Sequence, residues 1–196
     1  MKQLSENKTK LSDPICGLLF SLIVLTFGSE TASAAPSPET IKGNGMIAYV
    51  TDGDTARVHL PEAVVAQAKK AARIAEQRYQ RDMDLERIYE KDNMLIRVAN
   101  IDTAESVHKD ASRNTKAGKV ASDFANTMFA ADRVRVICYK VGYYGRPICD
   151  IRSNDGDWAE IMIRAGYTKY ITKWGRHPDS SRHRSLSQAQ AETFSN

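Results

Sequence analysis

Short runs of alternating apolar and polar residues divide the chain into strands separated by turns and helical segments. Five runs have the length and composition of strands: residues 46–50, 55–60, 94–101, 134–139 and 147–152. Because most of these runs are close in sequence to the next one, a small barrel is favoured over a parallel sheet.

We predict three helices, over residues 112–131, 157–165 and 182–192: the first has apolar residues at helical spacing, and the third is polar. The second begins with Asp157, a residue type that caps helix starts, and is followed by Gly166 as a stop signal. Strands and helices therefore mix in the pattern of an α+β domain.

The stretch between the second and third predicted strands, residues 61–92, is long and rich in Ala, Arg and Glu. We expect one long helix or a helical hairpin here, inserted between two strands, from an apolar stripe at Val64, Ala68, Ala71, Ala75 and Tyr79. Its first part is basic and its last part is acidic. A surface helix packed on one narrow face explains this composition; a substrate-gripping arm, a lid or a protein-binding element are functional alternatives.

The first 34 residues have the three parts of a secretory signal peptide: a positive start, an apolar run over residues 15–28 and small residues at 32–34. The apolar run has about 14 residues, whereas a membrane-spanning helix needs roughly 20. We therefore expect a cleaved signal rather than an uncleaved anchor. The mature chain would be exported, periplasmic or secreted, with no stable membrane association.

Cleavage would leave a linker at residues 35–43 and one domain at residues 44–196, with the insertion at 61–92. The chain has a formal net charge of +4, and the signal segment contributes three Lys and three acidic residues, so the mature chain keeps this charge. Such a mild basic balance permits a polyanionic substrate without requiring one.

Only two cysteines remain in the expected mature chain, Cys138 and Cys149, on either side of a glycine-bounded turn. An antiparallel hairpin could place them face to face. In an oxidising compartment they would form a cross-strand disulfide; the alternative is a pair of buried free thiols. No nearby residues complete a zinc ligand set.

The most informative feature is an apolar strand that contains Arg97 and ends in an acidic turn with Asp102 and Glu105. An unpaired charge among apolar residues is costly, so Arg97 either faces solvent from the polar side of the strand or points at an anion. Asp102 suits a hard cation such as calcium or magnesium. Glu105 could accept a proton from an attacking water, or else lie in solvent.

Two further motifs extend this set. Asp54 follows a glycine at a strand–turn–strand junction upstream, and Arg146 follows the Gly145 turn downstream. Guanidinium groups match phosphate oxygens in a bidentate way and stay charged. Two carboxylates for a cation, a third as a base and two arginines for a phosphate together indicate a phosphodiesterase site.

In these motifs the chain resembles the staphylococcal-nuclease-type thermonucleases, which are calcium-dependent nucleases on a five-stranded OB-fold barrel with three helices. The resemblance is carried by Asp52-Gly53-Asp54-Thr55, by Ile96-Arg97 through Asp102-Thr103-Ala104-Glu105, by Tyr144-Gly145-Arg146 and by the helix from Trp158 to Gly166. It covers roughly residues 44–60 and 94–192. It implies an α+β OB-fold barrel with three helices, and the long helix at 61–92 as an insertion between two barrel strands.

For the metal, the resemblance implies Ca²⁺ bound by Asp54, Asp102 and the backbone carbonyl of Thr103. Asp52 would lie close to the ion without binding it directly. The family usually has Pro where this chain has Ala104, a change that loosens the loop but removes no ligand.

For the reaction, the resemblance implies that Arg97 and Arg146 contact the scissile phosphate and stabilise its charge. Glu105 would be the general base, and Tyr144 would touch a neighbouring phosphate. The family cleaves the 5′ oxygen–phosphorus bond of DNA and RNA and leaves 3′-phosphate ends. Tyr170 and Trp174 are candidates for stacking on a nucleotide base, or else are core or surface aromatics.

The leading prediction is thus an exported calcium-dependent endonuclease that acts on DNA and RNA. The alternative is a non-catalytic OB-fold module that binds nucleic acid and recruits a partner protein through its helical insertion. The complete catalytic set favours the enzyme, because a module without chemistry has little reason to keep it.

Overall fold

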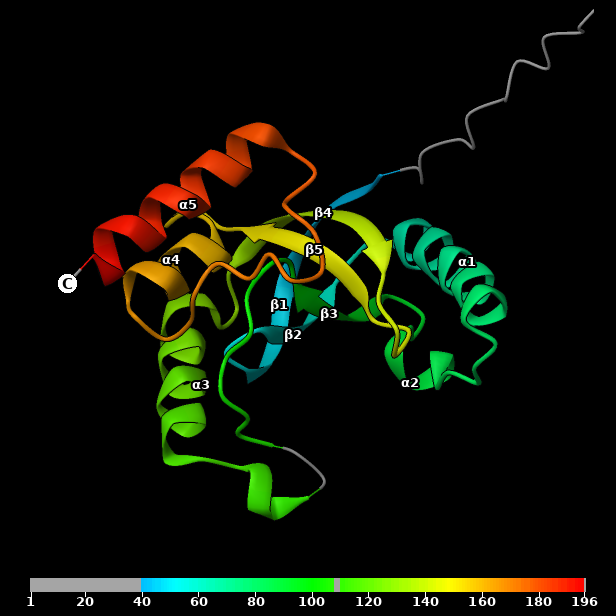
Figure 1. The fold of residues 1–196 in the computed structure, drawn as a ribbon. Helices are drawn as coiled ribbons and strands as arrows, with labels where there is room; N and C mark the ends of the chain where they lie inside the picture. The colour runs from blue at the N-terminus through cyan, green and yellow to red at the C-terminus, as the bar shows by residue number, and fades with distance from the viewer. Residues whose placement is uncertain (1–39, 108–109, 196) are drawn as a thin grey trace, which may run out of the picture. The chain divides into compact units, whose positions relative to one another are not determined.

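A closed five-stranded β-barrel forms the centre of the fold (Figure 1). The computed structural model describes residues 40–107 and 110–195. The strands are β1 (Ile41–Asp52), β2 (Thr55–His59), β3 (Asn93–Val98), β4 (Arg133–Val141) and β5 (Pro147–Arg152). They are joined in the order β1-β2-β3-β5-β4, and only β3 and β5 are parallel. This is the α+β OB-fold barrel that the sequence predicts.

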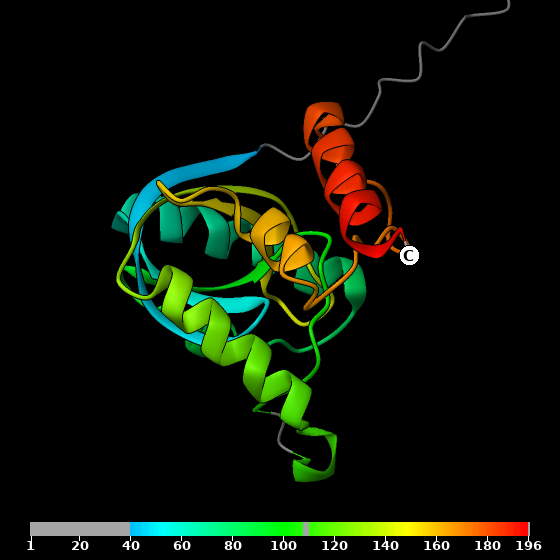
Figure 2. The ribbon, with the colours of Figure 1, turned by 90° about the vertical axis from the view of Figure 1, so that its left-hand side faces the viewer.

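Six helical segments surround the barrel in the part of the chain that the structure describes. They are α1 (Glu62–Tyr79), α2 (Leu85–Ile88), the 3₁₀ turn η1 (Ala111–Arg113), α3 (Lys116–Phe129), α4 (Trp158–Arg164) and α5 (Ser180–Phe194). Viewed from the side, α3 runs along β1, and α5 packs on α4 (Figure 2). None of these helices is long and apolar enough to cross a membrane.

Two helices begin at residues other than those predicted, because side-chain caps set their starts. Helix α3 begins at Lys116 rather than at residue 112, because the Thr115 hydroxyl accepts the Gly118 N–H and caps the helix there. Helix α5 begins at Ser180 rather than at residue 182, because Asp179 accepts the N–H groups of residues 181 and 182. The middle predicted helix is expected to begin at Asp157. This residue is the N-cap of α4, because its carboxylate accepts the Glu160 N–H.

Two strand boundaries also differ from the prediction. Strand β1 begins at Ile41, which pairs with Cys138 on β4, so residues 41–43 belong to the barrel and not to the linker expected at 35–43. Strand β3 ends at Val98 because Asn100 takes the left-handed conformation, with φ of 58°. The signal peptide expected at residues 1–34 lies outside the described residues.

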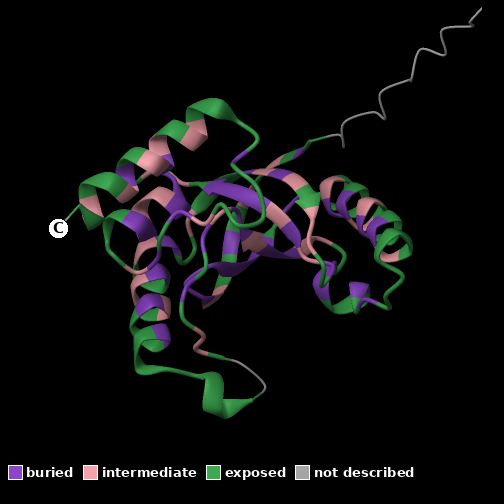
Figure 3. Cartoon of the chain, viewed as in Figure 1, coloured by how far each residue is buried: buried purple, intermediate pink, exposed green. Residues whose placement is uncertain are grey.

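The core fills the barrel and the space between the barrel and the helices (Figure 3). Trp158 at the start of α4 is fully buried and stacks on Phe129 of α3, with 4.1 Å between the ring centroids. Its indole N–H donates to the Gly53 carbonyl at 2.9 Å. The core thereby holds the turn between β1 and β2, which carries Asp54.

The insertion at 61–92 consists of two helices, α1 and the one-turn α2, rather than of a single long helix. Gln80 ends α1 in the left-handed conformation, with φ of 48°. The buried face of α1 consists of Val65, Ala68, Ala72 and Ala75. Of the five positions in the predicted stripe, Ala68 and Ala75 are buried and residues 64 and 71 are half-buried against the core, so the predicted face is confirmed there, whereas Tyr79 is exposed.

The two cysteines of the β4–β5 hairpin are joined. Cys138 and Cys149 face each other across the antiparallel pair and form a disulfide. The bond closes the hairpin whose turn carries Tyr144 and Arg146. Of the two alternatives, the structure has the bonded form.

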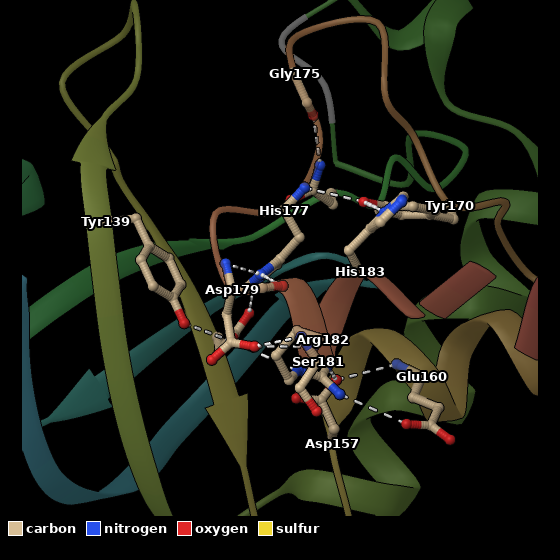
Figure 4. A network of polar contacts seen from close by, with 12 residues as sticks. Tyr139, Asp157, Glu160, Tyr170, Gly175, His177, Asp179, Ser181, Arg182 and His183 are labelled. Carbon is tan, nitrogen blue, oxygen red and sulfur yellow. Dashed lines mark hydrogen bonds and ion pairs between the residues drawn. The ribbon is translucent and has the colours of Figure 1, made fainter. Parts of the chain in front are cut away.

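Buried ion pairs attach α5 to the rest of the domain (Figure 4). The Arg182 side chain, only 11% exposed, contacts Asp150 of β5, the N-cap Asp157 and Glu160 of α4. Asp150 also contacts the Nε2 atom of the buried His177 at 3.0 Å. Burial raises the pKa of Asp157, and the charge of Arg182 opposes that rise. Arg182 is thus the cation that compensates this acidic group.

Replacing Arg182 with Met should lower the free energy of unfolding by about 3–5 kcal/mol, because buried carboxylates then lose their cation. Urea denaturation with the disulfide intact measures this loss. The exposed Arg184 of the same helix is the matched control, and Arg184→Met should change stability by less than about 0.5 kcal/mol. Equal losses in the two variants would contradict the role of Arg182.

Candidate functional site

Asp54 is the buried centre of the site. It lies in the turn between β1 and β2, and only 1% of the residue is exposed. Its Oδ2 accepts the Thr103 N–H at 2.8 Å, and its Oδ1 accepts the Thr55 hydroxyl at 3.0 Å. The preceding Gly53 makes this packing possible, since a Cβ there would lie 2.8 Å from the Thr103 side chain. The turn is therefore fixed against the loop after β3.

Arg97 lies between two carboxylates. Its Nη1 is 2.8 Å from Oδ1 of Asp54, and its Nη2 is 2.5 Å from Oδ1 of Asp102. Only 16% of its side chain is exposed. Of the two alternatives in the sequence, the structure shows Arg97 directed at anionic groups rather than at solvent. One guanidinium group thus brings Asp54 and Asp102 to the same place.

Backbone hydrogen bonds fix the loop after β3, while its acidic side chains stay partly exposed to solvent. The Thr168 hydroxyl accepts the Asp102 N–H and donates to the Asp102 carbonyl. The Glu105 carbonyl accepts the Thr115 N–H at 2.9 Å, and Gly118 of α3 packs so closely that a Cβ would overlap this carbonyl. The side chains of Asp102 and Glu105 remain 41% and 37% exposed. Solvent and substrate can therefore reach both carboxylates.

Arg146 joins the cluster from the β4–β5 turn. Its Nη1 donates to the Thr55 hydroxyl at 3.0 Å, and this hydroxyl donates in turn to Asp54. Burial lowers the pKa of Arg146, and the charge of Arg97 lowers it further. The carboxylates of Asp54, Asp52 and Glu105 act in the opposite direction. Two arginines and several carboxylates thus share one small volume.

The protein compensates the charge of Asp54 only in part. Burial raises the pKa of Asp54 to about 7, against an ordinary value of 3.8; Arg97 lowers this pKa, and the neighbouring Asp52 raises it. The Asp52 carboxylate accepts the Asp54 N–H at 3.3 Å, so it lies directly beside the site. Burial therefore favours the protonated form of Asp54, and the charge of Arg97 favours the ionised form.

The donor set suits a hard cation held mainly by oxygen atoms. Within residues 40–107 and 110–195, no group of three or more His, Cys, Asp or Glu side chains is placed to hold a metal. Asp54 and Asp102 supply two carboxylates, and Thr103, which directly follows Asp102, donates its N–H to Asp54. A cation here would need backbone carbonyls and water as further ligands, which calcium and magnesium accept.

The other predicted residues lie at or beyond the edge of this cluster. Tyr144 is 62% exposed and contacts the guanidinium of Arg81, at 4.8 Å from its ring centroid. Tyr170 is a core residue, because its hydroxyl accepts the His177 N–H and it is only 7% exposed (Figure 4). Trp174 is 60% exposed, with Lys173 against its ring. Of the two predicted stacking candidates, only Trp174 remains available.

Three supporting residues were not assigned a role from the sequence. Thr55 connects Asp54 to Arg146, Thr168 holds Asp102, and Trp158 holds the turn at Gly53. Thr55 directly follows the Asp-Gly-Asp motif, which is a sequence signal. Thr168 lies 66 residues from its partner, so only the tertiary structure reveals that contact.

An OB-fold barrel with a carboxylate–arginine cluster defines a nuclease-like class of protein. The family model described as "Staphylococcal nuclease homologue" matches residues 95–194, slightly more than half of the chain. The chain belongs to this family, as its motifs predict. The matched range begins within β3, after the insertion, and includes Arg97, Asp102, Glu105 and Arg146. A search of curated proteins found no match to the chain.

Replacing Asp54 with Asn should change how stability depends on pH in metal-free protein. The folded state holds the Asp54 proton up to a pKa of about 7, whereas the unfolded chain releases it near 3.8. Between these values the folded state binds more protons, so the stability contribution of Asp54 is complete at low pH and is lost as the pH rises. The wild type should therefore lose up to about 1.4 kcal/mol per pH unit relative to Asp54→Asn.

Urea denaturation in a chelator at several pH values between 4 and 8 measures this difference. The exposed Asp123 of α3 provides the control, because Asp123→Asn should leave the pH dependence of the wild type unchanged. Parallel curves for wild type and Asp54→Asn would show that the Asp54 carboxyl titrates alike in both states.

Proposed function

We propose that the chain is an exported, calcium-dependent endonuclease that hydrolyses phosphodiester bonds of both DNA and RNA and leaves 3′-phosphate ends. The observation that carries the proposal is the convergence of Arg97, Arg146, Asp54 and Asp102 at one end of the barrel. Membership of the nuclease homologue family supports nucleic acid as the substrate.

Asp54, Asp102 and the carbonyl of Thr103 would hold the calcium ion, with water as further ligands. The fit rests on two carboxylates that already meet around one cationic group, the guanidinium of Arg97. When bound, the ion neutralises charge on the phosphate and favours ionisation of the attacking water.

Arg97 and Arg146 bind the scissile phosphate from two sides. A guanidinium group donates two parallel hydrogen bonds to phosphate oxygens and stabilises the charge that develops in the transition state. Arg97 is held by two carboxylates in this structure, so it exchanges at least one of these contacts when it binds substrate. Arg146 donates to the neutral Thr55 hydroxyl, at 3.0 Å, and exchanges that contact at lower cost.

Glu105 acts as the general base. Its side chain is 37% exposed beside the arginines, so a water molecule can lie between it and a bound phosphate. Glu105 removes a proton from this water as the oxygen attacks phosphorus. The bond from phosphorus to the 5′ oxygen breaks, and that oxygen takes a proton from solvent. The products are a 3′-phosphate and a 5′-hydroxyl end.

Export is supported by two independent features. The sequence of residues 1–34 has the parts of a signal peptide. The bond between Cys138 and Cys149 suits an oxidising compartment, because the cytosol keeps thiols reduced. The calcium-dependent reaction fits the same location, where calcium is abundant.

The mature chain, residues 35–196, should cut single-stranded and double-stranded DNA and also RNA when calcium is present, and should cut none of them in excess chelator. End-group analysis of the products checks the bond that breaks: phosphatase-sensitive 3′ ends are expected. A folded protein that binds nucleic acid in calcium and never cuts it would instead support the non-catalytic binding module.

Glu105→Gln and Arg97→Ala should each lower turnover more than about a hundredfold, because each removes one proton-transfer or charge-stabilising group. Steady-state cleavage of a labelled oligonucleotide by folded variants measures the loss. Asp123→Asn, which changes an exposed carboxylate on α3, should keep near-normal turnover. Near-normal activity in either active-site variant would refute the role assigned to that residue.

A further inference from the structure

The turn that carries Tyr144 and Arg146 is seated on the insertion. The Tyr89 hydroxyl donates to the Gly145 carbonyl at 2.7 Å across 56 residues of sequence. Gly145 has φ of 83°, and a Cβ there would lie within 3.2 Å of Met83, Leu85 and Ile88. In Figure 1, α2 lies beside the tip of the β4–β5 hairpin. The insertion therefore supports an active-site turn rather than a remote surface.

Residues of the insertion and of the turn form an exposed group that we name the aromatic–arginine cluster. It consists of Tyr79, Arg81, Tyr143 and Tyr144. The rings of Tyr79 and Tyr143 are 5.6 Å apart, and those of Tyr143 and Tyr144 are 5.3 Å apart, both edge to face. The Arg81 guanidinium lies 4.7 Å and 4.8 Å from the centroids of the two turn tyrosines. Two segments distant in sequence thus build one surface.

The cluster has the properties of a binding surface rather than of a core. Tyr79, Tyr143 and Tyr144 are 39%, 52% and 62% exposed. No acidic side chain within residues 40–107 and 110–195 forms an ion pair with Arg81, although the insertion contains several nearby in sequence. An exposed cation beside partly exposed aromatic rings attracts an anion that also carries flat rings.

The cluster is also close to the catalytic groups. Tyr144 and Arg146 are separated by one residue, so their Cα atoms are at most about 7 Å apart. A nucleic acid strand whose phosphate lies on Arg146 therefore passes over the cluster within a few nucleotides.

We infer that the aromatic–arginine cluster, which the insertion helps to build, is a subsite for unpaired nucleotides beyond the two that flank the scissile phosphate. Bases stack on the tyrosine rings, and Arg81 contacts a phosphate. Bases within a duplex already stack on their neighbours and cannot use these rings. This inference rests on the proposed nuclease function and assigns the insertion as a substrate-gripping arm.

The test compares Tyr79→Ala and Arg81→Gln with the wild type on single-stranded DNA of about 12 nucleotides, a length within the range that stacking platforms bind. Each variant should raise KM about tenfold, the effect of losing one stacked base, and leave kcat unchanged within about twofold. The kcat/KM for a dinucleotide, which is too short to reach the cluster, should stay the same. Arg78→Gln, an exposed arginine in the last turn of α1, is the matched control and should behave as the wild type.

Two results would overturn the inference. An unchanged KM for the longer strand in both variants would show that the cluster is not a subsite. Equal losses of kcat on both substrates would show that the insertion only positions Arg146. Fluorescence anisotropy with the same strand in the Glu105→Gln background provides a readout without cleavage, where Arg81→Gln should weaken binding about tenfold. If the wild type cuts nothing, the nuclease proposal fails, while this binding comparison still decides on the subsite.

Discussion

The charge of Asp54 is the constraint on which the rest of the site depends. Its carboxylate is almost fully buried, and such a group is stable only with hydrogen bonds and a cation beside it. Thr103 and Thr55 supply the hydrogen bonds, and Arg97 supplies the charge. These contacts join the first barrel turn to β3 and to the acidic loop that follows. The residues proposed for catalysis are therefore brought together by the same contacts that satisfy one buried carboxylate.

A second ionic network contrasts with this site and shows what a structural network in the same fold does. Around Arg182, the carboxylates of Asp150, Asp157 and Glu160 share one cation, and most of these side chains are shielded from solvent (Figure 4). That network attaches α5 and offers no open carboxylate beside a phosphate-binding group. The Asp54 cluster keeps Asp102 partly open to solvent, as a site for a cation and a substrate requires.

The insertion changes the surface of the domain without changing its barrel. Loop closure between two neighbouring strands costs only slightly more when the loop is long, so every residue of β2 still pairs with β3. Arg57 of β2 fixes the inserted segment, since its guanidinium donates to the Arg87 carbonyl at 2.7 Å and pairs with Glu90. The catalytic geometry comes from the barrel, and the insertion adds contacts at its edge.

The sequence by itself determined the strand set, the order of the motifs and the family, because alternation, turn glycines and charged residues at strand ends are local signals. It also identified Arg97 as an unusual charge within an apolar strand. The helix starts at Lys116 and Ser180 were not predicted correctly, since side-chain caps decide them. Only the tertiary structure placed Arg97 between Asp54 and Asp102, joined Arg146 to Thr55 and put Arg81 over the turn tyrosines. These contacts connect segments far apart in the chain, and their geometry follows from barrel closure rather than from any local pattern.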